Sequence, residues 1–152
     1  MELIIWRHAE AEAGEPDEAR ALTAKGQKQA AKMGAWLDRH LPHNCKILVS
    51  PAVRTVQTAE ALGRKFKIHP GLAQGSPAQE ILAATQWPKA REPVLVVGHQ
   101  PALGRLISLL IGGSEQDWII RKGAVFWIAQ KSSEEEPLPF IRVALGVDML
   151  SK

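Results

Sequence analysis

Short apolar runs alternate with amphipathic segments along most of the chain. The runs are rich in β-branched and aromatic residues, and they predict strands at residues 3–6, 46–49, 67–69 and 93–97. The run at 93–97 is continuous, which is typical of a strand that is buried on both faces. The last quarter of the chain contains two further apolar runs, separated by a charged loop at 131–139. These runs, 124–129 and 140–145, predict an antiparallel hairpin.

The segments between these strands have helical periodicity. Thr23 is the expected N-cap of a helix whose apolar stripe is formed by Ala30, Met33, Leu37 and Leu41. Gly26 lies in the first turn of this helix, and we expect that turn to pack closely against the sheet. Further helices are predicted at 52–66, 78–87 and 103–111, the last one closed by Gly112 and Gly113, and a short helical turn is predicted at 114–121.

This order of elements predicts one α/β domain that spans residues 1–152. The expected architecture is three-layer α/β/α, with a mostly parallel central sheet of about six strands and one antiparallel edge hairpin. The chain is long enough to bury a core of its own, and it contains no internal repeat or linker.

Composition adds only a few constraints. Hydrophobic residues make up 45% of the chain and charged residues 23%, as in ordinary globular proteins. No segment approaches the ~20 apolar residues of a membrane span, the N-terminus does not resemble a secretory signal, and the single cysteine, Cys45, excludes an internal disulfide. A net charge of +3 is too small to indicate nucleic-acid binding. We therefore expect a cytoplasmic protein without nucleic-acid or membrane partners, and we assume a monomer.

Three predicted strands end in residues that suit the chemistry of an anion. Arg7 and His8 follow the first strand, Ser50 and Pro51 follow the second with Arg54 one helical turn later, and His99 follows the fourth. Parallel strands bring their carboxyl ends to one edge of the sheet, where ligands of α/β proteins bind. Two arginines and two histidines at that edge predict a site for a phosphoryl group, because guanidinium groups match phosphate oxygens bidentately.

The chain resembles the histidine phosphatase superfamily, the phosphoglycerate mutase-like group. Four segments carry the resemblance, in the order of that family: Arg7-His8, Leu22-Thr23-x-x-Gly26-x-x-Gln29-Ala30, Ser50-Pro51-x-x-Arg54-x-x-Gln57-Thr58-Ala59 and Val97-Gly98-His99-x-Pro101. The small size, the Arg-His-Ala sequence and the compact region between the third and fourth strands resemble the SixA-type phosphohistidine phosphatase branch.

The resemblance implies a role for each site residue. His8 is the expected nucleophile, which forms a covalent phosphohistidine that water then hydrolyses. One nitrogen of its ring is expected to donate to a backbone carbonyl, which leaves the other nitrogen free. Arg7, Arg54 and His99 are expected to surround the phosphoryl oxygens, and Arg20 to extend this anion site. Because these groups supply positive charge, no metal and no cofactor is implied.

One departure from the family bears on the substrate. Many relatives that act on phosphate esters use a Glu or Asp after the third strand as general acid, but Glu80 is the only acid in that segment here, and it falls on a predicted helix. A missing acid favours a good leaving group such as the nitrogen of phosphohistidine, so the expected substrate is a phosphohistidine on a signalling or phosphotransfer protein, such as a phosphotransfer domain. Two alternatives stay open: a small-molecule phosphomonoesterase and a non-catalytic phosphate-binding module.

Overall fold

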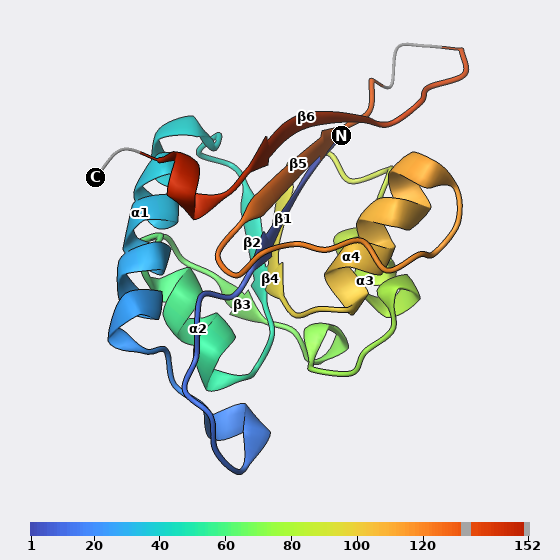
Figure 1. Cartoon of the computed structure of the whole chain (residues 1–152). Helices are drawn as coiled ribbons and strands as arrows, with labels where there is room; N and C mark the ends of the chain where they lie inside the picture. The colour runs from blue at the N-terminus through green and yellow to red at the C-terminus, as the bar shows by residue number, and fades with distance from the viewer. Residues whose placement is uncertain (132–134, 151–152) are drawn as a thin grey trace.

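The computed structural model describes residues 1–131 and 135–150, which form a six-stranded sheet between two layers of helices (Figure 1). The strand order is β3-β2-β4-β1-β5-β6. The strands are β1 (Glu2–Arg7), β2 (Lys46–Val49), β3 (Lys67–Ile68), β4 (Val94–Gly98), β5 (Val125–Ala129) and β6 (Phe140–Leu145). β1 to β4 are parallel, whereas β5 pairs antiparallel with both β1 and β6. The predicted fold class, including the antiparallel edge hairpin, is therefore confirmed.

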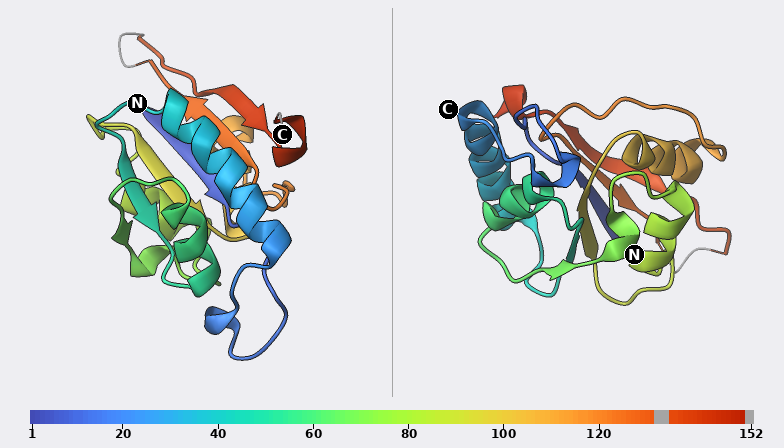
Figure 2. Two further views of the ribbon diagram at one scale, coloured as in Figure 1. Left: turned by 90° about the vertical axis from the view of Figure 1, so that its left-hand side faces the viewer. Right: turned by 90° about the horizontal axis from the view of Figure 1, so that it is seen from below.

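Helices cover both faces of this sheet (Figure 2). The α-helices are α1 (Ala24–His40), α2 (Val53–Glu60), α3 (Ala78–Thr85) and α4 (Ala102–Ile107). Short turns of other helical types are η1 (Asp17–Ala19), η2 (Pro70–Leu72), η3 (Ser108–Gly112) and η4 (Val147–Met149). Figure 1 shows α1 and α2 on one side of the sheet and α3 and α4 on the other. Within the described ranges, no helix is both long and apolar enough to cross a membrane.

The alternation of side chains along β1 explains why both faces are covered. Leu3 and Ile5 belong to the core cluster formed with α3 and α4, whereas Ile4 and Trp6 belong to the cluster formed with α1 and α2. All four side chains are fully buried. Because successive residues of a strand point to opposite faces, an apolar run without polar interruptions requires a helix layer on each side.

Two predicted helices are shorter than their sequence patterns. The helix predicted at 52–66 ends at Glu60, because the carbonyl of Ala61 abuts Gly34 of α1 and the backbone turns through a left-handed Gly63. A Cβ on Gly34 would lie 2.6 Å from that carbonyl oxygen. The helix predicted at 78–87 ends at Thr85, since Gln86 adopts a left-handed conformation with a φ of 59°.

The helical turn predicted at 114–121 is wrong. This segment runs as irregular chain over α4 and its continuation, held by tertiary hydrogen bonds. Ser108 Oγ donates to the carbonyl of Ser114 and accepts from the backbone N–H of Gln116, and the Gln100 amide donates to the carbonyl of Trp118. These side chains satisfy backbone groups that a helical turn would otherwise pair within itself. Residues 132–134 of the predicted charged loop lie outside the described residues.

Gly26 packs closely, but against a different partner from the one predicted. A Cβ on Gly26 would lie 1.9 Å from the carbonyl oxygen of Glu10, in the loop that follows β1, rather than against the sheet. Thr23 caps this end of α1 as predicted, since its hydroxyl accepts from the backbone N–H of Gly26. The glycine thus lets the first turn of α1 touch the loop that begins at His8.

Candidate active site

Three neighbouring strands end in register at one edge of the sheet. Arg7 pairs with Gly98, and Val49 pairs with Val97, so the residues that follow these strands emerge side by side. The backbone N–H of His8 donates to the carbonyl of Gly98 at 3.1 Å. The rings of His8 and His99 consequently lie 5.4 Å apart, measured between their centroids. The predicted convergence of His8 and His99 is therefore observed.

His8 is held as a neutral imidazole with a defined tautomer. Its side chain is buried, and Nδ1 lies 2.7 Å from the carbonyl oxygen of Ala9. Because a carbonyl only accepts, Nδ1 carries the proton and Nε2 keeps its lone pair. The pKa of His8 is lowered to about 4, chiefly by burial, with smaller contributions from the charges of Arg54, Arg7 and Arg20 and an opposing effect of the Ala9 bond. The ring is therefore neutral at physiological pH.

Thr58 supports this arrangement from α2. Its hydroxyl accepts the backbone N–H of Ala9 at 3.1 Å and donates to the carbonyl of Arg54 at 2.8 Å. Thr58 is fully buried, so both bonds are shielded from water. The peptide that orients His8 is thus tied to the same helix that carries Arg54.

His99 is the second buried imidazole of the site. Its Nε2 lies 2.7 Å from Ser50 Oγ, while its Nδ1 has no partner among the described residues. The pKa of His99 is lowered to about 3, chiefly by burial, with a further contribution from the charge of Arg54. A neutral His99 can present a hydrogen-bond donor to a phosphoryl oxygen without holding a second full charge beside His8.

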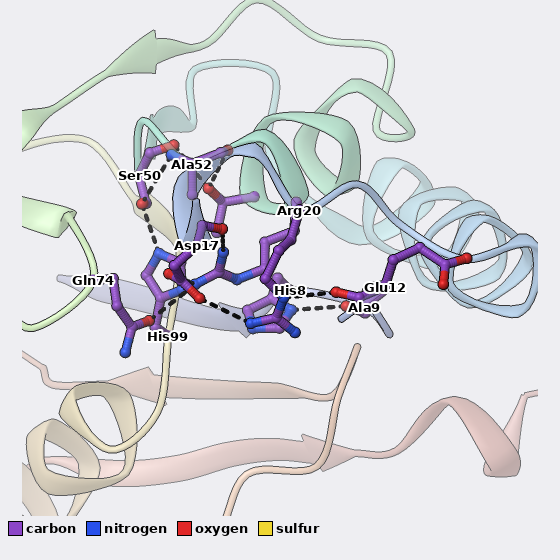
Figure 3. A network of polar contacts seen from close by, with 11 residues as sticks. His8, Ala9, Glu12, Asp17, Arg20, Ser50, Ala52, Gln74 and His99 are labelled. Atoms are coloured by element: carbon purple, nitrogen blue, oxygen red, sulfur yellow. Dashed lines mark hydrogen bonds and ion pairs between the residues drawn. The ribbon is translucent and has the colours of Figure 1, made fainter. Parts of the chain in front are cut away.

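Arg54 extends from the first turn of α2 into the centre of this cluster. Its side chain is only 2% exposed, and Nη2 donates to Oδ2 of Asp17 at 2.9 Å and to Oε1 of Gln74 at 3.2 Å. Nη1 donates to the backbone carbonyl of Asp17 at 2.8 Å. Figure 3 shows Asp17, Gln74 and His99 gathered in this network. The guanidinium thus faces oxygen acceptors on its outer edge, as it would with a bound phosphoryl group.

Asp17 is the residue of this cluster that the sequence interpretation missed. It lies in η1, within the loop after β1, and its carboxylate also accepts from Nη1 of Arg20 at 2.9 Å. Hydrogen bonds from Arg20 and Arg54 lower the pKa of this carboxyl. Asp17 is therefore an anion, and it contacts the arginine predicted to bind the phosphoryl group. The spacing of Asp17 and Arg20, three residues apart in a loop, was the only sequence signal for it.

Arg20 lies beside the same cluster. Its Nε donates to the carbonyl of Glu12 at 2.6 Å, and its positive charge contributes to the lowered pKa of His8. In Figure 3 a dashed line joins the Arg20 guanidinium to the carboxylate of Asp17. Arg20 thus lies in the same polar network as Arg54, and its role in extending the anion site stays a prediction.

Arg7 reaches the site from the end of β1. Its Nη1 donates to the carbonyl of Ile120 at 2.7 Å, and its buried Nε has no partner among the described residues. Burial lowers the pKa of Arg7, and its charge in turn contributes to the lowered pKa of both His8 and His99. Arg7 therefore lies close to both histidines while being anchored to the segment before β5.

Glu80, the candidate general acid, does not join this cluster. It is exposed on α3, and it makes no hydrogen bond to a site side chain within the described residues. The segment after β3 instead contributes the amide of Gln74 to Arg54. Asp17 is the acid in contact with Arg54, but its lowered pKa keeps it ionised and therefore unable to donate a proton.

The described part of the chain contains no group of three or more His, Cys, Asp or Glu side chains arranged to hold a metal ion. The carboxylate of Glu10, which follows His8 by two residues, accepts from the hydroxyl of Thr23 at 2.8 Å. The concentration of arginines around His8 is suited to an anion instead.

The family comparison agrees with this geometry. Residues 3–75 match the model of the histidine phosphatase superfamily, branch 1. A phosphohistidine phosphatase SixA homolog from Haemophilus influenzae is 34% identical over 128 residues, which cover 74% of this chain and 78% of that protein. The chain belongs to the histidine phosphatase superfamily, is of the SixA type, and is a phosphatase.

Solved structures extend the similarity over nearly the whole chain. A SixA-type protein from Nakamurella multipartitia superposes with a TM-score of 0.74 at 26% identity, covering 95% of this chain and 94% of the other. The protein histidine phosphatase SixA solved with tungstate superposes with a TM-score of 0.77 at 24% identity, covering 97% and 98%. The fold is therefore shared with these proteins, including the parts beyond residue 75.

Proposed function

We propose that this phosphatase removes the phosphoryl group from phosphohistidine on a protein, with His8 as the nucleophile. The observation that carries the proposal is the bond from His8 Nδ1 to the carbonyl of Ala9. This bond keeps the proton on Nδ1 and the lone pair on Nε2. The pKa of about 4 means that Nε2 is not protonated at physiological pH. An imidazole nucleophile needs both conditions, because a protonated ring has no lone pair to donate.

The reaction has two balanced steps. In the first, the lone pair of His8 Nε2 attacks phosphorus while the bond between phosphorus and the substrate nitrogen breaks, and its electron pair returns to that nitrogen. In the second, water attacks the phosphorus of phosphorylated His8, the P–N bond breaks, and inorganic phosphate leaves. His8 thereby recovers its neutral form, with Nδ1–H still bonded to Ala9.

The cationic side chains stabilise the transferred phosphoryl group. Arg54, Arg7 and Arg20 surround His8 closely enough to influence its titration, and His99 lies against it. Negative charge spread over the equatorial oxygens in the transition state is matched by these fixed donors. We propose that this charge makes a metal unnecessary, so activity is expected to survive treatment with EDTA, and loss of activity on chelation would contradict that part of the proposal.

The leaving group accounts for the preference for phosphohistidine. A phosphohistidine whose second ring nitrogen is protonated leaves as neutral imidazole, so it needs no general acid, whereas an alkoxide leaves poorly without a proton. Among the acids discussed, Asp17 is held ionised and Glu80 makes no contact with the site side chains. We propose the phosphohistidine of a phosphotransfer domain as the substrate. The name of the Haemophilus influenzae relative supports the same class.

A small-molecule phosphomonoesterase is the second candidate. A cavity of about 610 Å³ borders His99 and is lined in part by Ser76, Gln100 and Arg105. Its size suits the organic part of a small substrate. Phosphohistidine and a simple alkyl phosphate, compared at several pH values, separate the two candidates: a strong preference for the P–N bond supports the proposal, and equal rates favour the esterase.

Trapping of the covalent intermediate tests the nucleophile directly. Rapid quenching after mixing with labelled phosphoramidate is expected to give an acid-labile, base-stable adduct on wild-type protein and none on His8→Ala. His40→Ala is the matched control, because His40 also directs Nδ1 to a carbonyl, that of Trp36, but is exposed on α1. This control is expected to form the adduct normally. Turnover that persists in His8→Ala would disprove the mechanism, and phosphate binding without any adduct would indicate a non-catalytic binding module.

A further inference from the structure

A cavity of about 630 Å³ lies beside Arg7, between α1, residues 119–122 and the turn at 146–148. We call it the basic cavity, because its lining contains six cationic side chains: Arg7, Lys25, Lys28, Lys32, Arg121 and Lys122. Figure 1 shows α1 and η4 adjacent to each other, with the chain before β5 passing the end of β1. This side of the molecule is therefore assembled from segments far apart in the sequence.

The acids of the basic cavity do not neutralise this charge. Glu10 and Asp148 are its two carboxylates. Glu10 accepts from the hydroxyl of Thr23 at 2.8 Å, and Asp148 lies 3.5 Å from Arg121 in an exposed pair that contributes little. Lys25, Lys28 and Lys32 form no ion pair within residues 1–131 and 135–150. The cavity consequently presents an excess of positive charge to solvent.

The lysines of α1 form a regular row. Lys25, Lys28 and Lys32 follow one another at spacings of three and four residues, so they lie on one face of the helix, and all three are exposed. The row is about 10 Å long at the rise of an α-helix. A row of this length suits an extended set of carboxylates better than a single small anion.

An exposed apolar side chain lies among these charges. Ile119 lines the cavity and is 82% exposed, whereas the adjacent Ile120 is 1% exposed and accepts from Arg7 through its carbonyl. Burial of Ile120 fixes the backbone and so presents Ile119 outward. An apolar contact within a charged surface is a feature of protein interfaces. It favours a protein segment over an inorganic polyanion such as polyphosphate, because polyphosphate has no apolar group that could pack against Ile119.

We propose that the basic cavity docks an acidic, partly apolar segment of the phosphorylated partner protein and thereby selects the protein substrate of His8. This inference rests on the proposed function for the identity of the partner. Arg7 connects the two regions, since it lines the cavity and also lowers the pKa of His8. The cavity beside His99 is unsuited to an acidic segment, because its Arg105 is paired with Asp117 at 2.6 Å.

Three phosphohistidine peptides of equal length test the preference. They carry the same phosphohistidine next to Glu and Leu, Gln and Leu, or Lys and Leu residues. For wild-type protein, kcat/KM for the acidic peptide is expected to exceed that for the neutral peptide by about tenfold at low salt, and the ratio is expected to fall as salt screens the attraction. Equal values for the acidic and neutral peptides would overturn the inference while leaving the proposed function intact.

Substitution of the lysine row locates the effect. In the triple variant Lys25→Gln, Lys28→Gln, Lys32→Gln, the ratio of kcat/KM between acidic and neutral peptides is expected to fall towards one. Glutamine keeps a similar helix propensity, so α1 is expected to remain folded.

A matched control removes the same charge elsewhere. Lys46, Lys89 and Arg91 lie around the amino ends of β2 and β4, at the opposite end of the strands from His8. The triple variant Lys46→Gln, Lys89→Gln, Arg91→Gln is expected to keep the wild-type ratio. A loss of the ratio as large as that in the lysine-row variant would show that only net charge matters and would overturn the docking site.

Binding without catalysis separates this inference from the proposed function. Calorimetric titration with the unphosphorylated acidic peptide is expected to show binding that the lysine-row variant loses. Ile119→Ser is expected to weaken binding of the Glu and Leu peptide but not of a peptide of Glu and Gln.

If no phosphohistidine peptide is hydrolysed but this binding is seen, the proposed function fails and the docking site stands. Tighter binding of inorganic polyphosphate or single-stranded DNA than of the acidic peptide would contradict the proposed occupant.

Discussion

The carboxylate of Asp17 bridges Arg54 and Arg20, with Oδ2 2.9 Å from Nη2 of Arg54 and Oδ1 2.9 Å from Nη1 of Arg20. A side-chain anion therefore occupies guanidinium donors that the proposed mechanism assigns to the substrate phosphoryl group. Because a bound phosphoryl group would compete with the Asp17 carboxylate for these donors, we expect the carboxylate to move aside when the substrate binds. The loop after β1 is thus linked electrostatically to substrate binding.

Removal of the Asp17 charge is expected to strengthen anion binding. In Asp17→Asn the competing carboxylate is lost, so the inhibition constant of inorganic phosphate is expected to decrease by about tenfold, equivalent to about 1.4 kcal/mol. Asp38→Asn is the control, because Asp38 pairs with Arg64 at 2.8 Å and makes no hydrogen bond to a site residue within the described part of the chain. An inhibition constant that increases in Asp17→Asn would instead show that Asp17 positions Arg54 for the phosphoryl group.

Arg54 is expected to carry a large part of the transition-state stabilisation. Arg54→Ala is expected to lower kcat by roughly 10²–10³, and Arg54→Lys to recover only part of this, because a lysine keeps the charge but lacks the planar fork. Steady-state kinetics with phosphohistidine measure the effect. Arg142→Ala serves as control, since Arg142 lies on β6 and pairs with Glu2. A nearly wild-type rate in Arg54→Ala would remove Arg54 from the catalytic site.

The buried histidines predict a loss of stability in mild acid. Between pH 6.5 and about 4, the unfolded chain binds a proton at His8 that the folded protein does not bind. The free energy of unfolding therefore decreases as the pH falls through this window, by roughly 3 kcal/mol for His8, and His99 adds a loss of the same sign that extends to about pH 3.

Urea denaturation at a series of pH values measures this slope. His8→Gln is expected to lose less stability than wild type between pH 6.5 and 4, whereas the exposed His40→Gln is expected to follow the wild-type curve. Identical curves for His8→Gln and wild type would show that His8 is not a buried neutral imidazole. Catalysis needs the neutral ring of His8. Protonation of His8 is therefore expected to lower kcat only as the pH approaches 4.

Thr58 is expected to act as a positioning residue for His8. The carbonyl of Ala9 fixes the tautomer of His8, and the N–H of Ala9 donates to the Thr58 hydroxyl. Thr58→Val removes this acceptor, so kcat is expected to fall by about tenfold with a small change in KM. Thr58→Ser retains the hydroxyl and is expected to restore kcat. A purely structural role would instead lower the free energy of unfolding in Thr58→Val and leave kcat of the folded fraction unchanged.

Gly26 is expected to tolerate no side chain. Gly26→Ala would place Cβ 1.9 Å from the carbonyl oxygen of Glu10, so the loop after His8 must shift, and a destabilisation of about 1–3 kcal/mol is expected together with reduced kcat. Gly112→Ala is the control, because its Cβ would meet its nearest heavy atom at 3.7 Å, an ordinary contact. Equal stability of Gly26→Ala and wild type would show that the loop and α1 separate easily.

Local patterns predicted most of the elements because those patterns act within a few residues. The strands, the Thr23 cap and the hairpin followed from apolar runs and capping chemistry. The C-terminal end of α2 was not predicted, because it depends on the contact between Gly34 and Ala61. The irregular chain at 114–121 was not predicted either, because it depends on the hydrogen bond from Ser108 to Ser114. Sequence periodicity does not relate the segments that make these contacts.

Local sequence patterns were enough to predict the sheet, its helix layers and the convergence of Arg7-His8, Arg54 and His99, because parallel strands bring their carboxyl ends to one edge. The neutral state of His8 follows from the folded arrangement, since the pKa of its ring depends on burial and on charges from other segments. The contact between Asp17 and Arg54, which are 37 residues apart in the chain, likewise exists only in the folded protein. Burial and long-range charge are properties of the folded arrangement, and no local pattern encodes them.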